Sequence, residues 1–410
     1  MPAKSVTVAP LRRRDIPRTA DYRRTSNDSA VLRAVLDHGP VARSTIARLV
    51  GLSPAAVTRL SAELMAAGLL RESAAVPGPK PVGRPHVPVE IDTGGRVACG
   101  LHITLKHSTI ALLDLRGQVI AKERLPHLDT GSRQVIARAA ARIPEFLAQH
   151  AEGRAPLGLG VATGGWVDRA DGVIIEHAGL GWRGVPVRQQ LEDATGLPVR
   201  VDNQARALAR GEQLFGDERA QASVVQLFVA NMIDAAFSTG GKIHHGPQSA
   251  AGFVAHLPLE GRTERCVCGR HGCLQAVVAS DELGVRAARA GITPEPSFEA
   301  ALAAARRGDR RALALFHDRA KLIGAAAALL LDVLNPELLA VFEAGVMDLP
   351  GCMETLRAEV GERTRHRVNP GRSIIASSFR GHVGDVAAGT VILDAVYANP
   401  LRAPSAQRRD

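Results

Sequence analysis

The chain has 410 residues, of which 46% are hydrophobic and 22% are charged, a composition typical of a globular protein with more than one domain. This composition excludes a chain that is disordered throughout, and the longest apolar run, residues 322–334, is shorter than the roughly 20 residues that span a bilayer. The net charge is +10, and residues 1–90 hold 14 Lys and Arg against 7 Asp and Glu, whereas the rest of the chain holds 37 against 34.

The positive charge is therefore concentrated at the amino-terminal end. This asymmetry favours a polyanionic partner, nucleic acid before a membrane, and its alternative is a solvated arginine-rich tail. Residues 1–26 lack the apolar stretch that an export signal needs, so we expect a cytoplasmic protein without a membrane partner. In a reducing compartment, clustered cysteines bind metal or do redox chemistry more often than they form structural disulfides.

Residues 1–25 are expected to form a disordered basic arm, and residues 26–90 to form three short helices with a linker. Apolar residues recur at helical spacing in the first helix, which Gly39-Pro40 should end. Ser44 is expected to cap the second helix, and Gly51 to turn the chain after it. The apolar residues of the first helix are Val31, Leu32, Val35 and Leu36.

The third helix has a start signal and an outer face of small or hydrogen-bonding side chains. Ser53 is suited to cap it, and Pro54 to occupy its first position. Small polar side chains on an exposed face permit close approach to base edges in a major groove, so we expect a recognition helix. The residues predicted on this face are Ala55, Thr58, Arg59, Ser61 and Ala62, and we add Ser44 and Ser53 to the DNA-contacting set.

After Gly68, an extended segment and a Pro-rich return resemble the wing of a winged helix-turn-helix. Arg84 would then lie at the wing tip, where a guanidinium can enter a narrow minor groove. The alternative is that the three helices form a packing or dimerisation module and that Arg84 is linker charge.

From Ile91 the pattern changes to alternating strands and helices, which predicts an α/β layered body. Two apolar helices are expected late in the chain, over 317–335 and 384–397, in the core of a lobe or at a subunit interface. The other expected elements are three strands over 97–125, a helix over 132–150, a strand over 157–163, a helix over 186–195, a strand over 198–203 and further strands over 223–243.

The stretch "CVCGRHGCLQ", residues 266–275, holds three of the five cysteines of the chain. Three thiolates and one imidazole satisfy a closed tetrahedral zinc site, and Gly269 and Gly272 permit the tight turns that bring the ligands together. The alternatives are buried free thiols or a redox switch.

The order of "GLGVATGGWVD", "VRVDNQARALARGE", "AAGFVAH" and "CVCGRHGCLQ" resembles the ROK family of repressors and sugar kinases. The resemblance implies a two-lobed actin-like (ribonuclease-H-like) body behind a winged helix-turn-helix. It implies a small lobe over 91–202, to which 385–410 returns, and a large lobe over 203–384 with the zinc site and the dimerisation helices. The zinc ligands it implies are His256, Cys266, Cys268 and Cys273, with His271 as an alternative fourth ligand.

The resemblance also indicates that the parts of a kinase are altered. The glycine-rich first phosphate loop matches "HITLK", in which His102 replaces an aspartate and Thr104 and Leu105 replace glycines. The second loop matches "ANMIDAA", which contains no glycine and includes Asp234. The catalytic aspartate matches Gln204, and an amide cannot act as a general base at neutral pH.

The sugar-binding set is altered in the same way. Asn203 and His256 match the family, whereas two glutamates are replaced by Phe253 and Gln275. Each lost carboxylate removes charge-assisted hydrogen bonds worth roughly 1.5 to 3 kcal/mol. This degenerate pocket, which includes Gln204, either accepts a different effector, sugar-like or altered, or is vestigial.

These observations predict a homodimer, or a dimer of dimers, that represses transcription by binding a double-stranded DNA operator and controls genes of sugar or secondary metabolism. Two alternatives remain at this point: a sugar kinase with an appended DNA-binding domain, and a scaffold that binds no DNA. Activation instead of repression is also left open.

Overall fold

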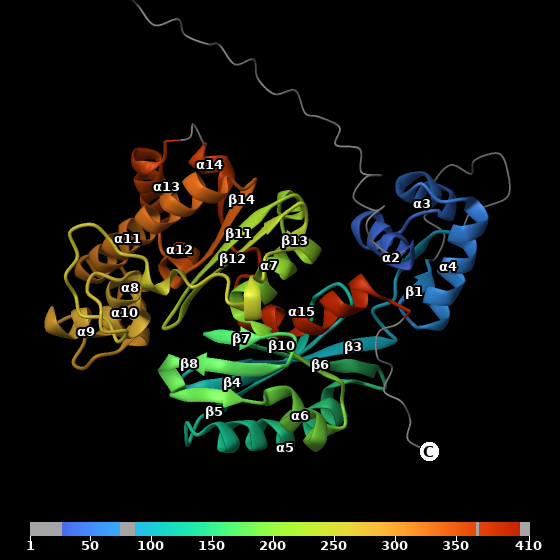
Figure 1. The fold of residues 1–410 in the computed structure, drawn as a ribbon, viewed down its shortest axis with the longest axis horizontal. Coiled ribbons are helices and arrows are strands. Elements are labelled where there is room, and N and C mark those ends of the chain that lie inside the picture. Colours follow the sequence, from blue (N-terminus) through green and yellow to red (C-terminus); the bar gives the residue numbers. More distant parts are fainter. Residues whose placement is uncertain (1–26, 74–86, 366–368, 402–410) are drawn as a thin grey trace, which may run out of the picture. The chain divides into compact units, whose positions relative to one another are not determined.

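The computed structural model describes residues 27–73, 87–365 and 369–401, which divide into two compact units. The first unit extends to Asp92 and includes Ala395–Ala403, and the second extends from Thr93 to Asp394 (Figure 1). The predicted basic arm at 1–25 lies outside the described residues, as do Arg84 and residues 74–86 of the predicted wing.

The first unit contains three helices followed by two antiparallel strands, in which Leu70 lies opposite Ile91. The apolar residues that recur at helical spacing in the first helix are buried, as predicted. Gly51 adopts the left-handed conformation (φ 70°) that ends the second helix. The elements are α2 (Asn27–His38), α3 (Arg43–Val50), α4 (Pro54–Ala66), β1 (Leu70–Glu72) and β2 (Val89–Ile91).

The end of the last helix also belongs to the first unit. Helix α15 (Val383–Ala398) begins in the second unit, and its residues from Ala395 are grouped with the first. The hydroxyl of Ser29 on α2 donates a hydrogen bond to the backbone oxygen of Tyr397 (2.6 Å), and both residues are buried. That residues 385–410 return to the small lobe stays a prediction.

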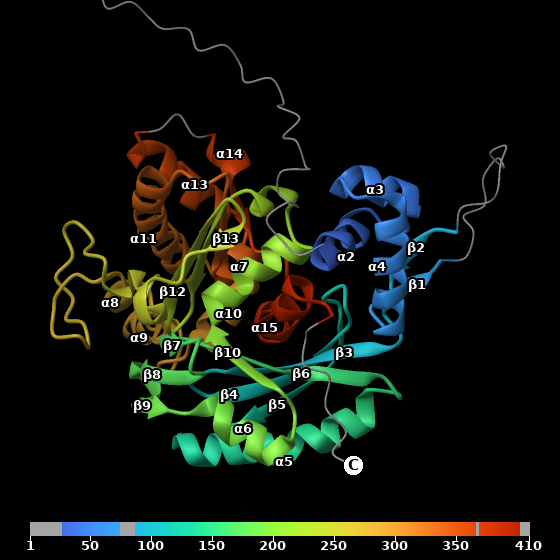
Figure 2. The same cartoon turned by 45° about the vertical axis from the view of Figure 1, so that its right-hand side comes forward.

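The second unit is built on two five-stranded sheets with the same topology (Figure 2). In each sheet, an antiparallel three-stranded meander is extended by two parallel strands. The first sheet contains β3 (Arg96–Ile103), β4 (His107–Leu113), β5 (Val119–Pro126), β6 (Ala155–Thr163) and β10 (Val199–Asn203). The second contains β11 (Val224–Val229), β12 (Ile233–Thr239), β13 (Lys242–Ile243), β14 (Leu338–Phe342) and β15 (Ile374–Ala376).

Two helices lie between these sheets, α7 (Gln204–Phe215) and α15 (Figure 2). Gly100 on β3 and Gly160 on β6 permit the close approach of α15, because a Cβ atom at Gly160 would lie 2.2 Å from the backbone oxygen of Ala388. Helices α5 (Ser132–His150) and α6 (Val187–Thr195) cover the opposite face of the first sheet. A small third sheet contains β7 (Trp166–Asp168), β8 (Val173–His177) and β9 (Trp182–Val185).

The remaining helices pack on the second sheet and on one another. The predicted α/β class is confirmed. Helix α11 begins at Arg310, earlier than the predicted residue 317, because the Asp309 side chain caps it by accepting from two backbone N–H groups. No helix among the described residues is long and apolar enough to cross a membrane. The helices are α8 (Leu274–Val278), α9 (Ser280–Arg289), α10 (Phe298–Arg306), α11 (Arg310–Leu334), α12 (Ala344–Asp348), α13 (Cys352–Arg363) and α14 (Pro370–Ser373).

A buried ion pair joins α11 to the end of β14. The guanidinium of Arg319 donates to the carboxylate of Glu343 (2.7 Å), and the two side chains are 1% and 0% exposed. Arg319 also donates to the backbone oxygen of Val278 and to the hydroxyl of Ser280. Each of the three guanidinium nitrogens therefore has a partner, as a buried charge requires.

We predict that Arg319→Met lowers the free energy of unfolding by about 3–5 kcal/mol, because it leaves the Glu343 carboxylate buried without its partner. Adding Glu343→Leu to this variant should restore much of the loss, since both charges are then removed. Urea unfolding followed by circular dichroism measures the effect, with the exposed Arg307→Met as the matched control. A single variant as stable as the parent would contradict this account.

Candidate functional site

Helix α4 presents one face to the core of the first unit and another to solvent. Val57, Leu60 and Leu64 are buried, at the spacing of one helical face. Ser53 caps the helix by accepting a hydrogen bond from the backbone N–H of Ala56 (3.2 Å), as predicted. The exposed residues on and before the helix include Ser53, Ala55, Thr58, Arg59 and Ala62.

Two sequence-based expectations on this surface are wrong. Ser61 is 0% exposed, because it follows Val57 by four residues and so lies on the core face, where its hydroxyl has no hydrogen-bond partner. Ser44 does not cap α3, since the helix begins at Arg43 and Ala42 occupies the cap position without a side-chain bond. Ser44 is nevertheless exposed, near the beginning of that helix.

The basic side chain on the outer face of α4 is held by an acidic neighbour. Arg59 donates to the carboxylate of Glu63, one turn along the helix, at 2.6 Å. This pair was not predicted from the sequence, although its four-residue spacing is a sufficient signal. Arg43 was also missed; it bonds to Glu72 of β1 and to the backbone oxygen of Val87, and so ties α3 to the strands.

The predicted metal ligands converge in the second unit. The ligand atoms of His256, Cys266, Cys268 and Cys273 all lie within 4.8 Å of one another, and His271 is outside this group. Such a set, with three sulfurs and one ring nitrogen, fits a tetrahedral metal ion. Gly272 permits the convergence, because its φ is 69° and an added Cβ would lie 2.4 Å from the backbone oxygen of Arg262.

The electrostatic surroundings of this cluster differ from one thiol to the next. Hydrogen bonds from the backbone and side chain of Arg270 lower the pKa of Cys268 to about 6, which favours the thiolate that a metal binds. Burial raises the pKa of Cys273 to about 11 and lowers the pKa of His256, which favours a neutral imidazole. The residues present therefore fit a metal ion of the kind that prefers sulfur and nitrogen ligands.

A chain of hydrogen bonds crosses the space between the two sheets. Gln204, the first residue of α7, donates from Nε2 to the carboxylate of Asp234 on β12 (3.0 Å), and its Oε1 lies 3.1 Å from Nε2 of His102 on β3. Since the amide oxygen of Gln204 accepts, Nε2 of His102 carries the proton. All three side chains are buried.

Burial also sets the charge states along this chain. It lowers the pKa of His102, so the imidazole is neutral at pH 7. It raises the pKa of Asp234 to about 6, against hydrogen bonds from Gln204 and Asn203 that lower it. The centre therefore contains an amide between a neutral imidazole and a buried carboxyl, and the amide has no basic atom with which to take a proton.

Apolar side chains fill the loops on either side of this chain. Met232, in the loop between β11 and β12, packs against Gly164, where an added Cβ would lie 2.9 Å from the Cβ of Met232. Leu105, in the loop between β3 and β4, packs against Gly179, where an added Cβ would lie 2.6 Å from its Cδ2. Asp281 and Glu299 lie 3.6 and 3.9 Å from Nζ of Lys106, so charges also bridge the two lobes. The lost glycines were recognised from the sequence, whereas the packing of Met232 and the ion pairs of Lys106 were not.

The residues of the predicted sugar pocket do not all meet. Asn203 lies at this centre, but its Oδ1 caps α7 and its Nδ2 donates to the backbone oxygen of Gly165. Gln275 donates to the backbone oxygen of Asn231 in the β11–β12 loop, and His256 belongs to the metal cluster. Phe253 is 45% exposed and lies edge-on to Trp166, with ring centroids 6.0 Å apart.

A model of the ROK family matches residues 98–393, most of the chain. The chain belongs to the ROK family. It is 34% identical over 389 residues to the Transcriptional regulator Rv0485 of Mycobacterium tuberculosis, covering 92% of this chain and 86% of that one. It is 24% identical over 401 residues to the DNA-binding transcriptional repressor Mlc of Escherichia coli, covering 94% of this chain and 97% of that one. It is 28% identical over 267 residues to a glucokinase of Halalkalibacterium halodurans, covering 61% of this chain and 77% of that one.

The solved structures give the same fold. A ROK family transcriptional regulator, described as a homologue of E. coli Mlc, superposes with a TM-score of 0.75 over 93% of this chain and 98% of its own, at 24% identity. A ROK family glucokinase from Streptomyces griseus superposes with a TM-score of 0.63 over 72% of this chain and 98% of its own, at 22% identity. The ROK fold predicted from the sequence is thus confirmed, and regulators and kinases are both among the relatives.

We predict that the buried Asp234 makes the stability of this ROK chain depend on pH. Because its pKa is higher when folded than the ordinary 3.8, its contribution to stability is complete below about pH 4 and is lost as the pH rises through about 6. Relative to Asp234→Asn, the free energy of unfolding of the parent should fall by about 1 to 2 kcal/mol between pH 5 and pH 7.5.

Urea unfolding at the two pH values measures this difference. Asp171→Asn is the control, because that carboxylate is exposed. A constant difference between the parent and Asp234→Asn would show that the carboxyl is not protonated on folding.

Proposed function

We propose that the chain is a DNA-binding transcriptional regulator, acting as a repressor, whose body does not phosphorylate sugars. The observation that carries the proposal is the free outer face of α4, capped by Ser53 and followed by the β1–β2 pair, in a chain whose relatives include named repressors. An exposed helix of this kind, after a short turn from α3, has the geometry of a recognition helix in a major groove.

In this proposal Thr58 and Arg59 contact base edges, and Ser44 and Ser53 contact the backbone of the duplex. The ion pair between Arg59 and Glu63 would open on binding, because a guanidinium can exchange one carboxylate for guanine acceptors or phosphate. Arg84 is proposed to enter the minor groove, and it lies outside the described residues.

Loss of kinase activity is part of the same proposal. The position that the family uses for its catalytic base holds Gln204, whose amide is committed to His102 and Asp234. Met232 and Leu105 lie in the two loops that are glycine-rich in the family's kinases and would have to approach phosphate groups, and side chains there prevent a cradle of backbone N–H groups. The alternative of a sugar kinase gains support from the glucokinase relative but from none of these contacts.

The metal cluster is proposed to hold a structural zinc ion. The ion would tie the segment around His256 to the loop that carries Cys266, Cys268 and Cys273, and so order the start of α8. No position is left for a substrate on a four-ligand ion, which distinguishes a structural from a catalytic site.

We also propose that the protein is a homodimer, or a dimer of dimers. Leu329 and Val333 on α11 are 47% and 71% exposed, and they lie on one face of the helix at a four-residue spacing. A two-fold dimer would present two copies of α4 to half-sites spaced by a whole number of helical turns. Genes of sugar or secondary metabolism are the proposed targets, and relatives named xylose repressors are consistent with the former.

DNA binding is tested by mapping the sites that the tagged protein occupies in its genome and measuring affinity for those duplexes by fluorescence anisotropy. We expect Arg59→Ala to weaken binding about tenfold or more, and Glu63→Gln to strengthen it, because the carboxylate both holds Arg59 and repels phosphate. Affinity should also fall steeply with salt. Arg133→Ala, an exposed change on α5, is the control, and unchanged binding by folded Arg59→Ala would refute the assigned role of α4.

Metal content is expected to be about one zinc per chain by elemental analysis. Cys268→Ser and Cys273→Ser should each lose the metal and lower the melting temperature, and a strong chelator should do the same to the parent. His271→Ala is the matched control, because this histidine lies outside the cluster. A folded, metal-free parent, or one with a disulfide among these cysteines, would support a redox role instead.

A further inference from the structure

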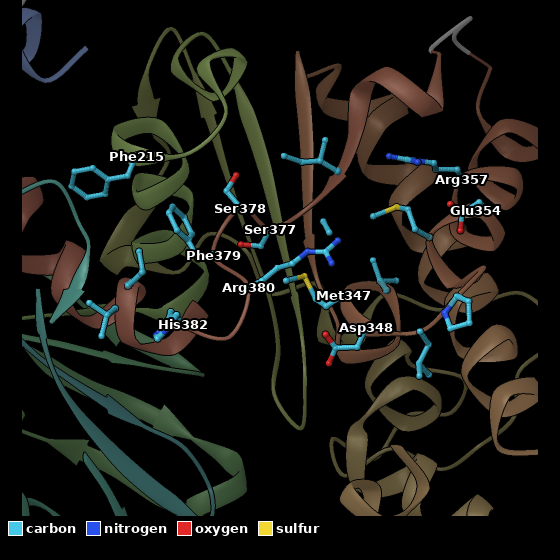
Figure 3. Close-up of a pocket in the computed structure, with 18 of the residues that line it drawn as sticks. Phe215, Met347, Asp348, Glu354, Arg357, Ser377, Ser378, Phe379, Arg380 and His382 are labelled. Atoms are coloured by element: carbon cyan, nitrogen blue, oxygen red, sulfur yellow. The ribbon is translucent and has the colours of Figure 1, made fainter. Parts of the chain in front are cut away.

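A cavity of about 980 Å³ opens in the second unit between the loop after β15 and the helices α12 and α13 (Figure 3). Phe215, Phe379 and His382 lie on one side of it, and Glu354 and Arg357 lie on the other. Its lining contains neither the hydrogen-bonded side chains of His102, Gln204 and Asp234 nor the loops at 104–107 and 230–236. It is therefore separate from the centre that the family resemblance identifies.

One wall of the cavity is apolar and fixed in place. Phe379 packs against Gly211 of α7, where an added Cβ would lie 3.3 Å from its ring. The preceding residues are pinned to the same helix, because Ser377 and Ser378 donate hydrogen bonds to the carboxylate of Glu212 (2.9 and 2.6 Å). With Phe215 and Met347, this wall offers aromatic and thioether surface to a ligand.

Arg380 presents a positive charge to the cavity. This side chain extends toward the wall that carries Met347 and Asp348 (Figure 3), is exposed, and has no ion-pair partner among the residues that the structure describes. Asp348 is already paired with Arg306. Glu354 lies three residues before Arg357 on the same face of α13, and Arg357 donates to the backbone oxygen of Ile374.

We propose that this cavity binds a small organic acid, with an aromatic or acyl body against Phe215, Phe379 and Met347 and its carboxylate on the guanidinium of Arg380. Aromatic and thioether surface beside a guanidinium that has no ion-pair partner among the described residues is the kind of lining that a small-molecule site uses. A carboxylate on a free guanidinium forms paired, charge-assisted hydrogen bonds, which a neutral ligand cannot reproduce.

The position of the site in the chain connects it to regulation, a step that rests on the proposed function. Arg380 belongs to the short segment between β15 and α15, and Lys122 of β5 holds that segment by bonding to the backbone oxygen of Gly381 and to Asp385. Helix α15 then runs without a break to Ala398, and from Ala395 it is part of the unit that carries α4. An acid that binds one conformation of this helix more tightly than another would shift the protein toward that conformation and so act as an effector.

The binding step is tested on the full chain by isothermal titration with two matched pairs: 2-naphthoate with 2-naphthamide, and decanoate with decanamide. We expect at least one acid to bind at least about tenfold more tightly than its amide, and Arg380→Gln to remove that preference. The pair that shows it identifies an aromatic or an acyl ligand. Arg372→Gln, an exposed change outside the cavity, should keep the preference.

The site is overturned if neither acid binds, if Arg380→Gln keeps the preference for the acid, or if AMP displaces the bound acid, which would make the cavity a nucleotide site. The effector role is tested separately, by adding the acid to the anisotropy assay with a mapped DNA site. A change in DNA affinity in the parent but not in Arg380→Gln supports it. If the acid binds and DNA affinity does not change, the effector role fails; if the chain binds no DNA at all, the proposed function fails while the acid site stands.

Discussion

The body of the molecule depends on one buried chain of hydrogen bonds, from His102 through Gln204 to Asp234. The three residues come from the first sheet, from the helix between the sheets and from the second sheet, so the chain joins both lobes at their centre. Burial leaves the imidazole neutral and raises the carboxyl pKa, and the central amide satisfies both neighbours at once. A buried network in which each member is paired favours one packed arrangement over an open, solvated cleft.

The other contacts described in the body stabilise its fold. Met232 and Leu105 pack where backbone would otherwise face a phosphate, and Lys106 reaches across to acidic groups of the other lobe. By contrast, the metal cluster keeps four convergent ligand atoms, and α4 keeps its cap and an exposed face. In the proposed function, packing takes the place of phosphoryl-transfer chemistry at the centre of the body, while the metal cluster serves architecture and α4 serves DNA contact.

Local signals in the sequence were sufficient for most of the fold. Helix and strand periodicity located the strands of the first sheet and the β11–β13 strands of the second, but not β14 or β15. Ser53 was predicted as a cap, and the spacing of the cysteines located the cluster of possible metal ligands. Ser61 was misplaced because its polar side chain gives no hint of burial by itself, although its spacing from Val57 and Leu64 places it on the core face. The packing of Met232 on Gly164 and the cavity around Arg380 could not be predicted, because they join segments far apart in the chain and depend on how the lobes close.

The most direct test of this account is a coupled assay of ATP turnover by the purified full chain, with hexoses and amino sugars offered in turn. The account predicts no sugar-dependent release of ADP above the background without sugar, and no recovery in Gln204→Asp, because restoring a carboxylate does not empty the loops filled by Met232 and Leu105. Sugar-dependent turnover that copurifies with the chain would contradict it, since an active phosphoryl-transfer centre cannot coexist with the packed contact described above.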